Sequence, residues 1–212
     1  MRTSTRWTLA VLAILGALAV ALALELADGP AQPRTATAPE QRTHRDADTP
    51  EALAGPRQRA GLPPCPIGGP GPGPEKLRAI VVECAADGSD VNAARVVADR
   101  TVVLNLWAYW CAPCAEELPA LQEYQRRVGD SVEVITVHQD ENETAALIRM
   151  AELGVRLPVL QDGRRSIAAA LGVPNVMPAT VVLRRDGSVA RVLPQPFTSA
   201  DEFAAAVDAA LR

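Results

Sequence analysis

Runs of β-branched and apolar residues alternate with amphipathic stretches from about residue 79 to the C-terminus. The runs have the length of strands and are bounded by Gly, Pro or Asp, whereas the stretches between them repeat their apolar positions at helical spacing. Strands are predicted over residues 79–84, 101–107, 132–137, 157–161, 179–184 and 189–193. Helices are predicted over residues 91–98, 111–128, 142–153, 166–171 and 199–211.

The order of these elements predicts an α/β fold with a central mixed sheet flanked by helices. Strands joined through a helix pair in parallel, which we expect for the first strands of the domain. The turn Arg185–Ser188 (RDGS) separates the last two runs and is typical of an antiparallel hairpin. Among single elements, Asp90 is expected to cap the helix over 91–98, and Pro119 to kink the helix over 111–128.

The beginning of the chain has a different pattern. The stretch Trp7–Leu24 carries no charge and, as a helix, is about 27 Å long, close to a hydrocarbon core of about 30 Å. Two arginines precede it and acidic residues follow, so the positive-inside rule places residues 1–6 in the cytoplasm and the rest of the chain outside. We predict a transmembrane signal-anchor over residues 7–26. The alternative is a signal peptide cleaved after Ala23, which would give a secreted form.

Residues 27–60 are rich in Pro, Ala, Thr and charge and show no hydrophobic periodicity. Such a stretch buries too little apolar area to offset its ordering entropy, so it predicts a disordered Pro/Ala-rich linker. The globular domain is expected over residues 61–212. It begins with the irregular Pro/Gly stretch Leu62–Pro74, in which Cys65 suggests an attachment to the fold.

Composition and charge exclude some classes of function. A hydrophobic fraction of 48% is enough for a core, and a net charge of −4 without a cluster of Lys or Arg argues against a nucleic-acid partner. The four cysteines are an even number, as expected in an oxidising compartment. The sequence calls for no cofactor.

The candidate chemistry lies in Trp110–Cys114 (WCAPC), which directly follows a predicted strand and opens a helix. A cysteine at a helix N-terminus has a lowered pKa because free backbone N–H groups and the dipole favour the thiolate. Pro113 suits the first turn, where its missing N–H would be unpaired. We therefore expect Cys111 to be the nucleophile, and Cys114, one turn further, to resolve the mixed disulfide.

Other uses of the cysteines are less well supported. A zinc site would need a second pair of ligands at similar spacing, but Cys65 and Cys84 are separated by 18 residues. A structural disulfide between Cys65 and Cys84 is the main expectation for this pair, and it would stabilise the domain by roughly 3 kcal/mol. A relay that exchanges with the first pair, and two free thiols, remain alternatives.

At this point the chain resembles a known family. Residues Val102–Pro119 (VVLNLWAYWCAPCAEELP) look like the active-site region of the thioredoxin superfamily, specifically its TlpA/ResA/DsbE-like membrane-anchored branch. The resemblance covers roughly Leu77–Arg212 and is more specific than a bare CxxC, because strand, Trp, CxxC and a Glu-Leu-Pro tail arrive in order. It implies a thioredoxin-like fold.

The resemblance also implies roles for further residues. In Val176–Thr180 (VMPAT), Pro178 matches the family's proline with a cis peptide bond, packed against the active-site disulfide, and an ordinary trans proline is the alternative. The backbone of Met177 would then pair with an extended substrate segment. Thioredoxins have a buried Asp where this chain has Asn105, which cannot titrate. Glu117 is therefore a candidate proton acceptor for Cys114, with a favourable charge near the helix N-terminus as the alternative.

For function, the resemblance implies an extracytoplasmic thiol–disulfide oxidoreductase acting on protein substrates. Ala112-Pro113 is similar to the Gly-Pro of reductants, which favours a disulfide reductase supplied with electrons by a membrane thiol carrier. Haem-attachment cysteines of apocytochrome c and copper-site thiols are the expected substrates. The alternatives are a disulfide oxidase or isomerase for secreted proteins, and a non-catalytic copper-binding chaperone with His138 as its third ligand.

Overall fold

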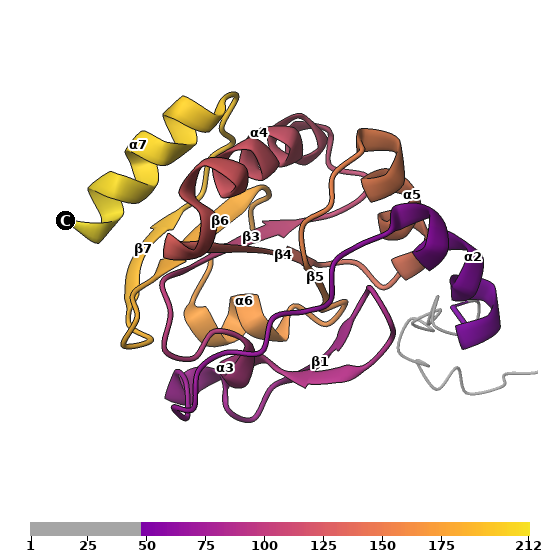
Figure 1. The fold of residues 1–212 in the computed structure, drawn as a ribbon, viewed down its shortest axis with the longest axis horizontal. Coiled ribbons are helices and arrows are strands. Elements are labelled where there is room, and N and C mark those ends of the chain that lie inside the picture. Colours follow the sequence, from indigo (N-terminus) through magenta and orange to yellow (C-terminus); the bar gives the residue numbers. More distant parts are fainter. Residues whose placement is uncertain (1–47) are drawn as a thin grey trace, which may run out of the picture. The chain divides into compact units, whose positions relative to one another are not determined.

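Seven strands form one mixed sheet in the computed structural model, which describes residues 48–212 (Figure 1). The strands are β1 (Val81–Cys84), β2 (Asp90–Asn92), β3 (Val102–Trp107), β4 (Glu133–His138), β5 (Val159–Gln161), β6 (Ala179–Leu183) and β7 (Val189–Leu193). The helices are α2 (Pro50–Ala60), α3 (Ala93–Val96), α4 (Ala112–Val128), α5 (Glu143–Leu153), α6 (Ser166–Leu171) and α7 (Ala200–Leu211). Two short 3-10 turns complete the order, η2 (Glu75–Leu77) and η3 (Gly129–Ser131).

The strand order is β2-β1-β5-β4-β3-β6-β7. Strands β3, β4 and β5 are parallel to one another, and β6 and β7 form the predicted antiparallel hairpin. The expectation that the first strands are parallel is wrong for β1, which pairs antiparallel with both β2 and β5. The reason is that β1 is joined to β2 by a tight turn and lies beside β5, a strand 75 residues further along the chain, with Glu83 opposite Gln161.

Each face of the sheet carries its own hydrophobic cluster, as expected for strands that are buried on both sides. One cluster joins the sheet to α4, α5 and α7, and the other joins it to η2, α3 and α6. Figure 1 shows α4 and α7 on one side of the strands and α3 and α6 on the other. Successive residues of β3 alternate between the clusters, so Val103 and Trp107 face α4, while Leu104 faces α6. This is the mixed, helix-flanked architecture that the element order predicted and the thioredoxin-like fold that the family resemblance implied.

The predicted elements agree with the structure to within two residues at each end, but the cap and the first residues of the helix over 91–98 are wrong. Its first residues form strand β2, in which Asp90 pairs with Glu83 of β1. The helix is therefore limited to α3, and its cap is Asn92, whose side chain accepts the N–H of Arg95. The local pattern did not reveal that β1 offers these residues a strand partner.

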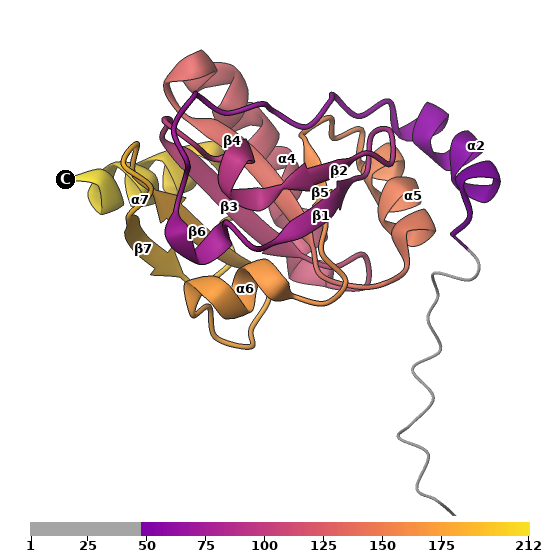
Figure 2. The same ribbon diagram turned by 90° about the horizontal axis from the view of Figure 1, so that it is seen from below.

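The predicted disordered linker over 27–60 is also wrong in its last eleven residues, which form helix α2. Thr49 caps this helix and Pro50 starts it. Leu53 and Ala60 are buried in the cluster beside α5, and both views show α2 next to α5 (Figure 1, Figure 2). The domain boundary expected at residue 61 is therefore too late.

Helix α2 is held to the domain by charges that lie far away in sequence. Arg57 donates to Glu83 at 2.5 Å and to Glu143 at 2.9 Å, and the side chain of Glu143 is only 4% exposed. Asp48, just before the helix, accepts the backbone N–H of Glu143 and the hydroxyl of Thr144. A weakly amphipathic sequence thus becomes a helix because tertiary contacts stabilise it.

The signal-anchor predicted over residues 7–26 lies outside the described part of the chain. Within residues 48–212, no helix has the length and apolar character needed to cross a bilayer.

Candidate active site

The two cysteines of the CxxC motif form a disulfide at the start of α4. Cys111 is the N-cap of this helix, and its Sγ accepts the backbone N–H of Cys114 at a distance of 3.3 Å. The same N–H and the helix dipole would stabilise a thiolate on Cys111 after reduction. Pro113 lies in the first turn and is exposed, as its missing N–H allows.

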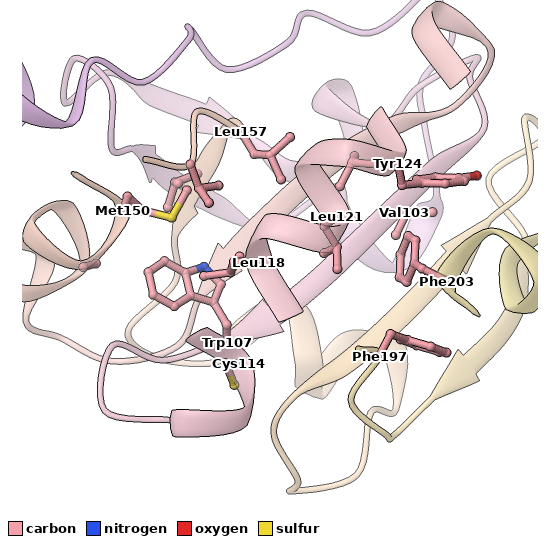
Figure 3. Close-up of a cluster of buried hydrophobic side chains, with 14 of the residues drawn as sticks. Val103, Trp107, Cys114, Leu118, Leu121, Tyr124, Met150, Leu157, Phe197 and Phe203 are labelled. Carbon is pink, nitrogen blue, oxygen red and sulfur yellow. The ribbon is translucent and has the colours of Figure 1, made fainter. Parts of the chain in front are cut away.

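The two sulfur-bearing residues differ in their access to solvent. Cys114 is fully buried and belongs to the hydrophobic cluster that also contains Trp107 and Leu118 (Figure 3). Cys111 is 6% exposed and lines a surface depression of about 350 Å³. The depression is bordered by Tyr109, Trp110, Cys111, Ala112, Ala115, Glu116, Arg149 and Leu153. A substrate can therefore reach Cys111, while Cys114 is shielded.

The loop before β6 lies at the same end of the sheet. The peptide bond between Met177 and Pro178 is cis. Leu106 of β3 pairs with Ala179 of β6, which places Pro178 at the carboxyl end of β3, where the chain turns toward Cys111. Met177 is half-buried and packs against the cluster that includes both cysteines.

Glu117 is a fully buried residue of α4 that faces strand β3. Its Oε2 accepts a hydrogen bond of 2.9 Å from Asn105 Nδ2, and Asn105 also contacts Thr180 Oγ1. Burial raises the pKa of Glu117 to about 7, although the hydrogen bonds from Asn105 and from the backbone of Phe197 partly oppose this rise. Because Glu117 lies three residues after Cys114, both occupy the same side of α4. The carboxyl group thus has a pKa suited to proton exchange at neutral pH.

Trp110 and Tyr109, the residues just before Cys111, are anchored by a network that the sequence did not predict. Trp110 is 56% exposed, and its Nε1 donates to Asp140 Oδ2 at 2.9 Å. The backbone N–H of Tyr109 faces His138 Nε2 at 3.4 Å, and His138 Nδ1 is 2.8 Å from Gln161 Oε1. A signal for this network was present in the sequence: the apolar strands β4 and β5 end in the polar residues His138 and Gln161 at the same edge of the sheet.

His138 is fully buried, and burial lowers its pKa to about 4. The neutral ring accepts from Tyr109 through Nε2 and donates to Gln161 through Nδ1. Both ring nitrogens are therefore engaged, and His138 could serve as a third copper ligand only by giving up one of these contacts. Within residues 48–212, no three His, Cys, Asp or Glu side chains come together in a way that could hold a metal ion.

The second pair of cysteines forms a disulfide with a Cα–Cα distance of 5.8 Å. It ties the irregular Pro/Gly stretch to Cys84, the fully buried last residue of β1. Cys65 packs against the cluster beside α3 and α6, whereas Cys111 and Cys114 lie in the cluster on the other face of the sheet. This separation favours a structural disulfide over a relay between the two pairs.

Comparison with known proteins gives a consistent picture. The sequence profile described as Redoxin matches residues 74–209. Thiol-disulfide oxidoreductase ResA of Bacillus thuringiensis (strain Al Hakam) is 33% identical over 91 residues, which are 42% of this chain and 52% of that protein. The chain thus spans about half the length of the curated relatives it matches.

Solved structures show the same fold. A DsbF homologue from Corynebacterium diphtheriae has 28% identity and a TM-score of 0.54, over 69% of this chain and 87% of that one. A secreted Mycobacterium tuberculosis disulfide oxidoreductase homologous to E. coli DsbE has 23% identity and a TM-score of 0.55. The match covers 64% of this chain and 98% of that one. These matches confirm the resemblance to the ResA- and DsbE-like branch of the thioredoxin superfamily. The chain belongs to the Redoxin family.

Proposed function

We propose that this protein is a thiol–disulfide oxidoreductase that reduces disulfides of protein substrates through Cys111 and Cys114. The observation that carries the proposal is the asymmetry of the pair at the start of α4. Cys111 borders an open depression, and its sulfur accepts a hydrogen bond from the backbone N–H of Cys114. Cys114 itself is buried one turn further along the helix. An attacking thiolate needs access and stabilisation, and a resolving thiol needs protection from other disulfides.

The reaction follows from this arrangement. In the reduced protein, the Cys111 thiolate attacks one sulfur of the substrate disulfide, a mixed disulfide forms, and the other substrate sulfur leaves as a thiolate that takes up a proton. Cys114 then loses its proton and attacks Cys111, so the Cys111–Cys114 disulfide forms and the second substrate thiol is released. Two electrons pass from the protein to the substrate.

Glu117 is the group that we propose accepts the proton of Cys114. It is buried on the same side of α4, and its pKa of about 7 lets it exchange a proton near neutral pH. Asn105 occupies the position where thioredoxins have a carboxyl group, and its amide holds the Glu117 carboxylate at 2.9 Å. Trp110 and Pro113 shape the loop around the cysteines, and the backbone of Met177, before the cis peptide bond to Pro178, would pair with an extended substrate segment.

Reduction is the proposed direction, supported by the Ala-Pro pair between the cysteines, which is similar to the Gly-Pro pair of reductants. A redox titration of the full chain against glutathione tests it. A potential near that of thioredoxin, about −270 mV, is expected, whereas a value well above about −200 mV would point to an oxidase or isomerase.

We further propose that the catalytic domain works outside the cytoplasm, attached to the membrane by the apolar stretch over residues 7–26. The charge distribution around that stretch supports this orientation. Electrons would come from a membrane thiol carrier, and the substrates would be haem-attachment cysteines of apocytochrome c or copper-site thiols. Protease accessibility of the domain in intact cells and in spheroplasts tests the location.

Insulin reduction tests the chemistry. We expect Cys111→Ser to abolish the reaction and Cys114→Ser to accumulate a mixed disulfide that thiol reagents can release. The double variant Cys65→Ala/Cys84→Ala is the matched control and should retain activity. The proposal fails if Cys111→Ser remains active, or if Cys114→Ser captures no substrate.

A further inference from the structure

We infer that Arg165 is a positioning residue that holds the loop Val173–Pro178 against the carboxyl end of β4, and thereby sets the affinity for protein substrates. This inference rests on the proposed function and deepens it. The loop lies at the same end of the sheet as the active-site disulfide, because Ala179 pairs with Leu106 near the carboxyl end of β3, the strand that leads to Cys111. Met177 also packs against the hydrophobic cluster to which both cysteines belong. A residue that fixes this loop therefore shapes the surface that a protein substrate meets.

The side chain of Arg165 connects two separate parts of the site. Its Nε donates to Gln139 Oε1 at 3.2 Å, and its Nη1 donates to Asn175 Oδ1. Gln139 directly follows β4, and its backbone N–H bonds to the carbonyl of Trp107 at 2.9 Å, next to the loop that leads to Cys111. Asn175 is exposed and stands two residues before Met177. The guanidinium group thus bridges the end of β4 and the loop before β6.

The backbone of Arg165 gives a second, independent reason to assign a role to its side chain. Its φ of 58° lies in the left-handed region, and in residues 48–212 only Asp99 shares this property among the non-glycine residues. A turn stabilised by Asp162 imposes this conformation, because the Asp162 carbonyl accepts the N–H of Arg165 and its carboxylate accepts those of Ser166 and Ile167. Glycine would adopt it without steric cost. The Asp162 turn thus holds an arginine where glycine would be free of strain, and strained positions of this kind cluster at functional sites.

The neighbouring residue supplies a matched control. Arg164 is exposed and makes no hydrogen bond or ion pair with any residue of the described part of the chain, although it carries the same charge. Replacing Arg164 by glycine changes the net charge as much as replacing Arg165. A difference between the two variants therefore reports the contacts of Arg165 and not the loss of a positive charge.

The test uses the full chain, pre-reduced and then oxidised by increasing amounts of insulin or by the small compound hydroxyethyl disulfide. We expect Arg165→Gly to raise the half-saturating insulin concentration about fivefold, as for the loss of one ordinary hydrogen bond, with an unchanged maximal rate. Its rate with hydroxyethyl disulfide should stay unchanged, and its Tm should not fall, because glycine relieves the strain. Amide hydrogen exchange in residues 173–177 should become faster. Arg164→Gly should match the wild type in every measurement.

Two results would overturn the inference. One is a change in the half-saturating insulin concentration of less than about twofold. The other is an equal loss of rate on insulin and on hydroxyethyl disulfide, which would place the effect at the cysteines and not at the loop. If Arg165→Gly does not fold, Asn175→Ala removes the same contact from the exposed side and must show the same shift. A wild-type chain inactive on both disulfides would instead refute the proposed function itself.

Discussion

Replacing Glu117 by glutamine removes the charge of a buried carboxyl group and keeps an acceptor for the amide of Asn105. Burial raises the pKa of Glu117 from 4.5 to about 7, so the folded state binds this proton more tightly than the unfolded state. The carboxyl group therefore supports the fold fully below pH 4.5, and this contribution is lost as the pH rises through 7. Because a tenfold change in an equilibrium constant is about 1.4 kcal/mol, the loss is about 3 kcal/mol.

The expected result is that Glu117→Gln unfolds at the same urea concentration as the wild type near pH 4.5 but is more stable by up to about 3 kcal/mol at pH 8. The stability of the variant is compared with that of the wild type at each pH, because His138 and Glu143 also titrate in this range and affect both proteins equally. The raised pKa of Glu143, about 7, makes both proteins less stable as the pH rises, whereas the lowered pKa of His138, about 4, makes both more stable as the pH rises. Glu116→Gln, which removes an exposed charge from the same turn of α4, is the control.

The same variant should resolve mixed disulfides more slowly than the wild type at neutral pH, because the proton acceptor for Cys114 is gone. A more stable but slower protein is the combined signature of a functional buried carboxyl group. A stability difference that does not change between pH 4.5 and 8 would refute the reasoning, since it would mean that Glu117 has the same pKa in both states.

Further predictions concern stability. Cys65→Ala/Cys84→Ala should lose about 3 kcal/mol in urea unfolding, the value expected for a sequence separation of 19 residues; an unchanged midpoint would contradict a structural role. Arg57→Ala leaves two carboxylates without their partner and should cost about 3 kcal/mol and expose α2 to proteolysis, whereas Arg59→Ala on the exposed side of the same helix should do neither. Phe203→Ala should cost about 4 kcal/mol by thermal or urea unfolding, because its ring is fully buried between two other aromatic rings; a loss below about 1 kcal/mol would show that the cluster refills the space.

Some features of the site could be predicted because they depend on residues close together in sequence. The strand, Trp110 and the CxxC pair predicted a disulfide at a helix start, and Cys111 is found there as the N-cap. Helix α6 and strand β7 have the bounds that their patterns predicted, because a glycine ends the helix and a tight turn starts the strand. Period and turn chemistry are local signals, so they can be read without a structure.

Other features required the tertiary structure, because they depend on partners that are distant along the chain. Helix α2 forms where a disordered linker was predicted. It is stabilised by the ion pair of Arg57 with Glu143, 86 residues away, and by apolar side chains that pack beside α5. Strand β1 also pairs antiparallel with β5, which lies far away along the chain, and no local pattern could show that pairing. The burial of Glu117 and the bridge from Arg165 to Asn175 likewise appear only after the elements pack. In this protein, short-range patterns determined where the reactive sulfurs stand, and long-range packing determined the charges and loops that surround them.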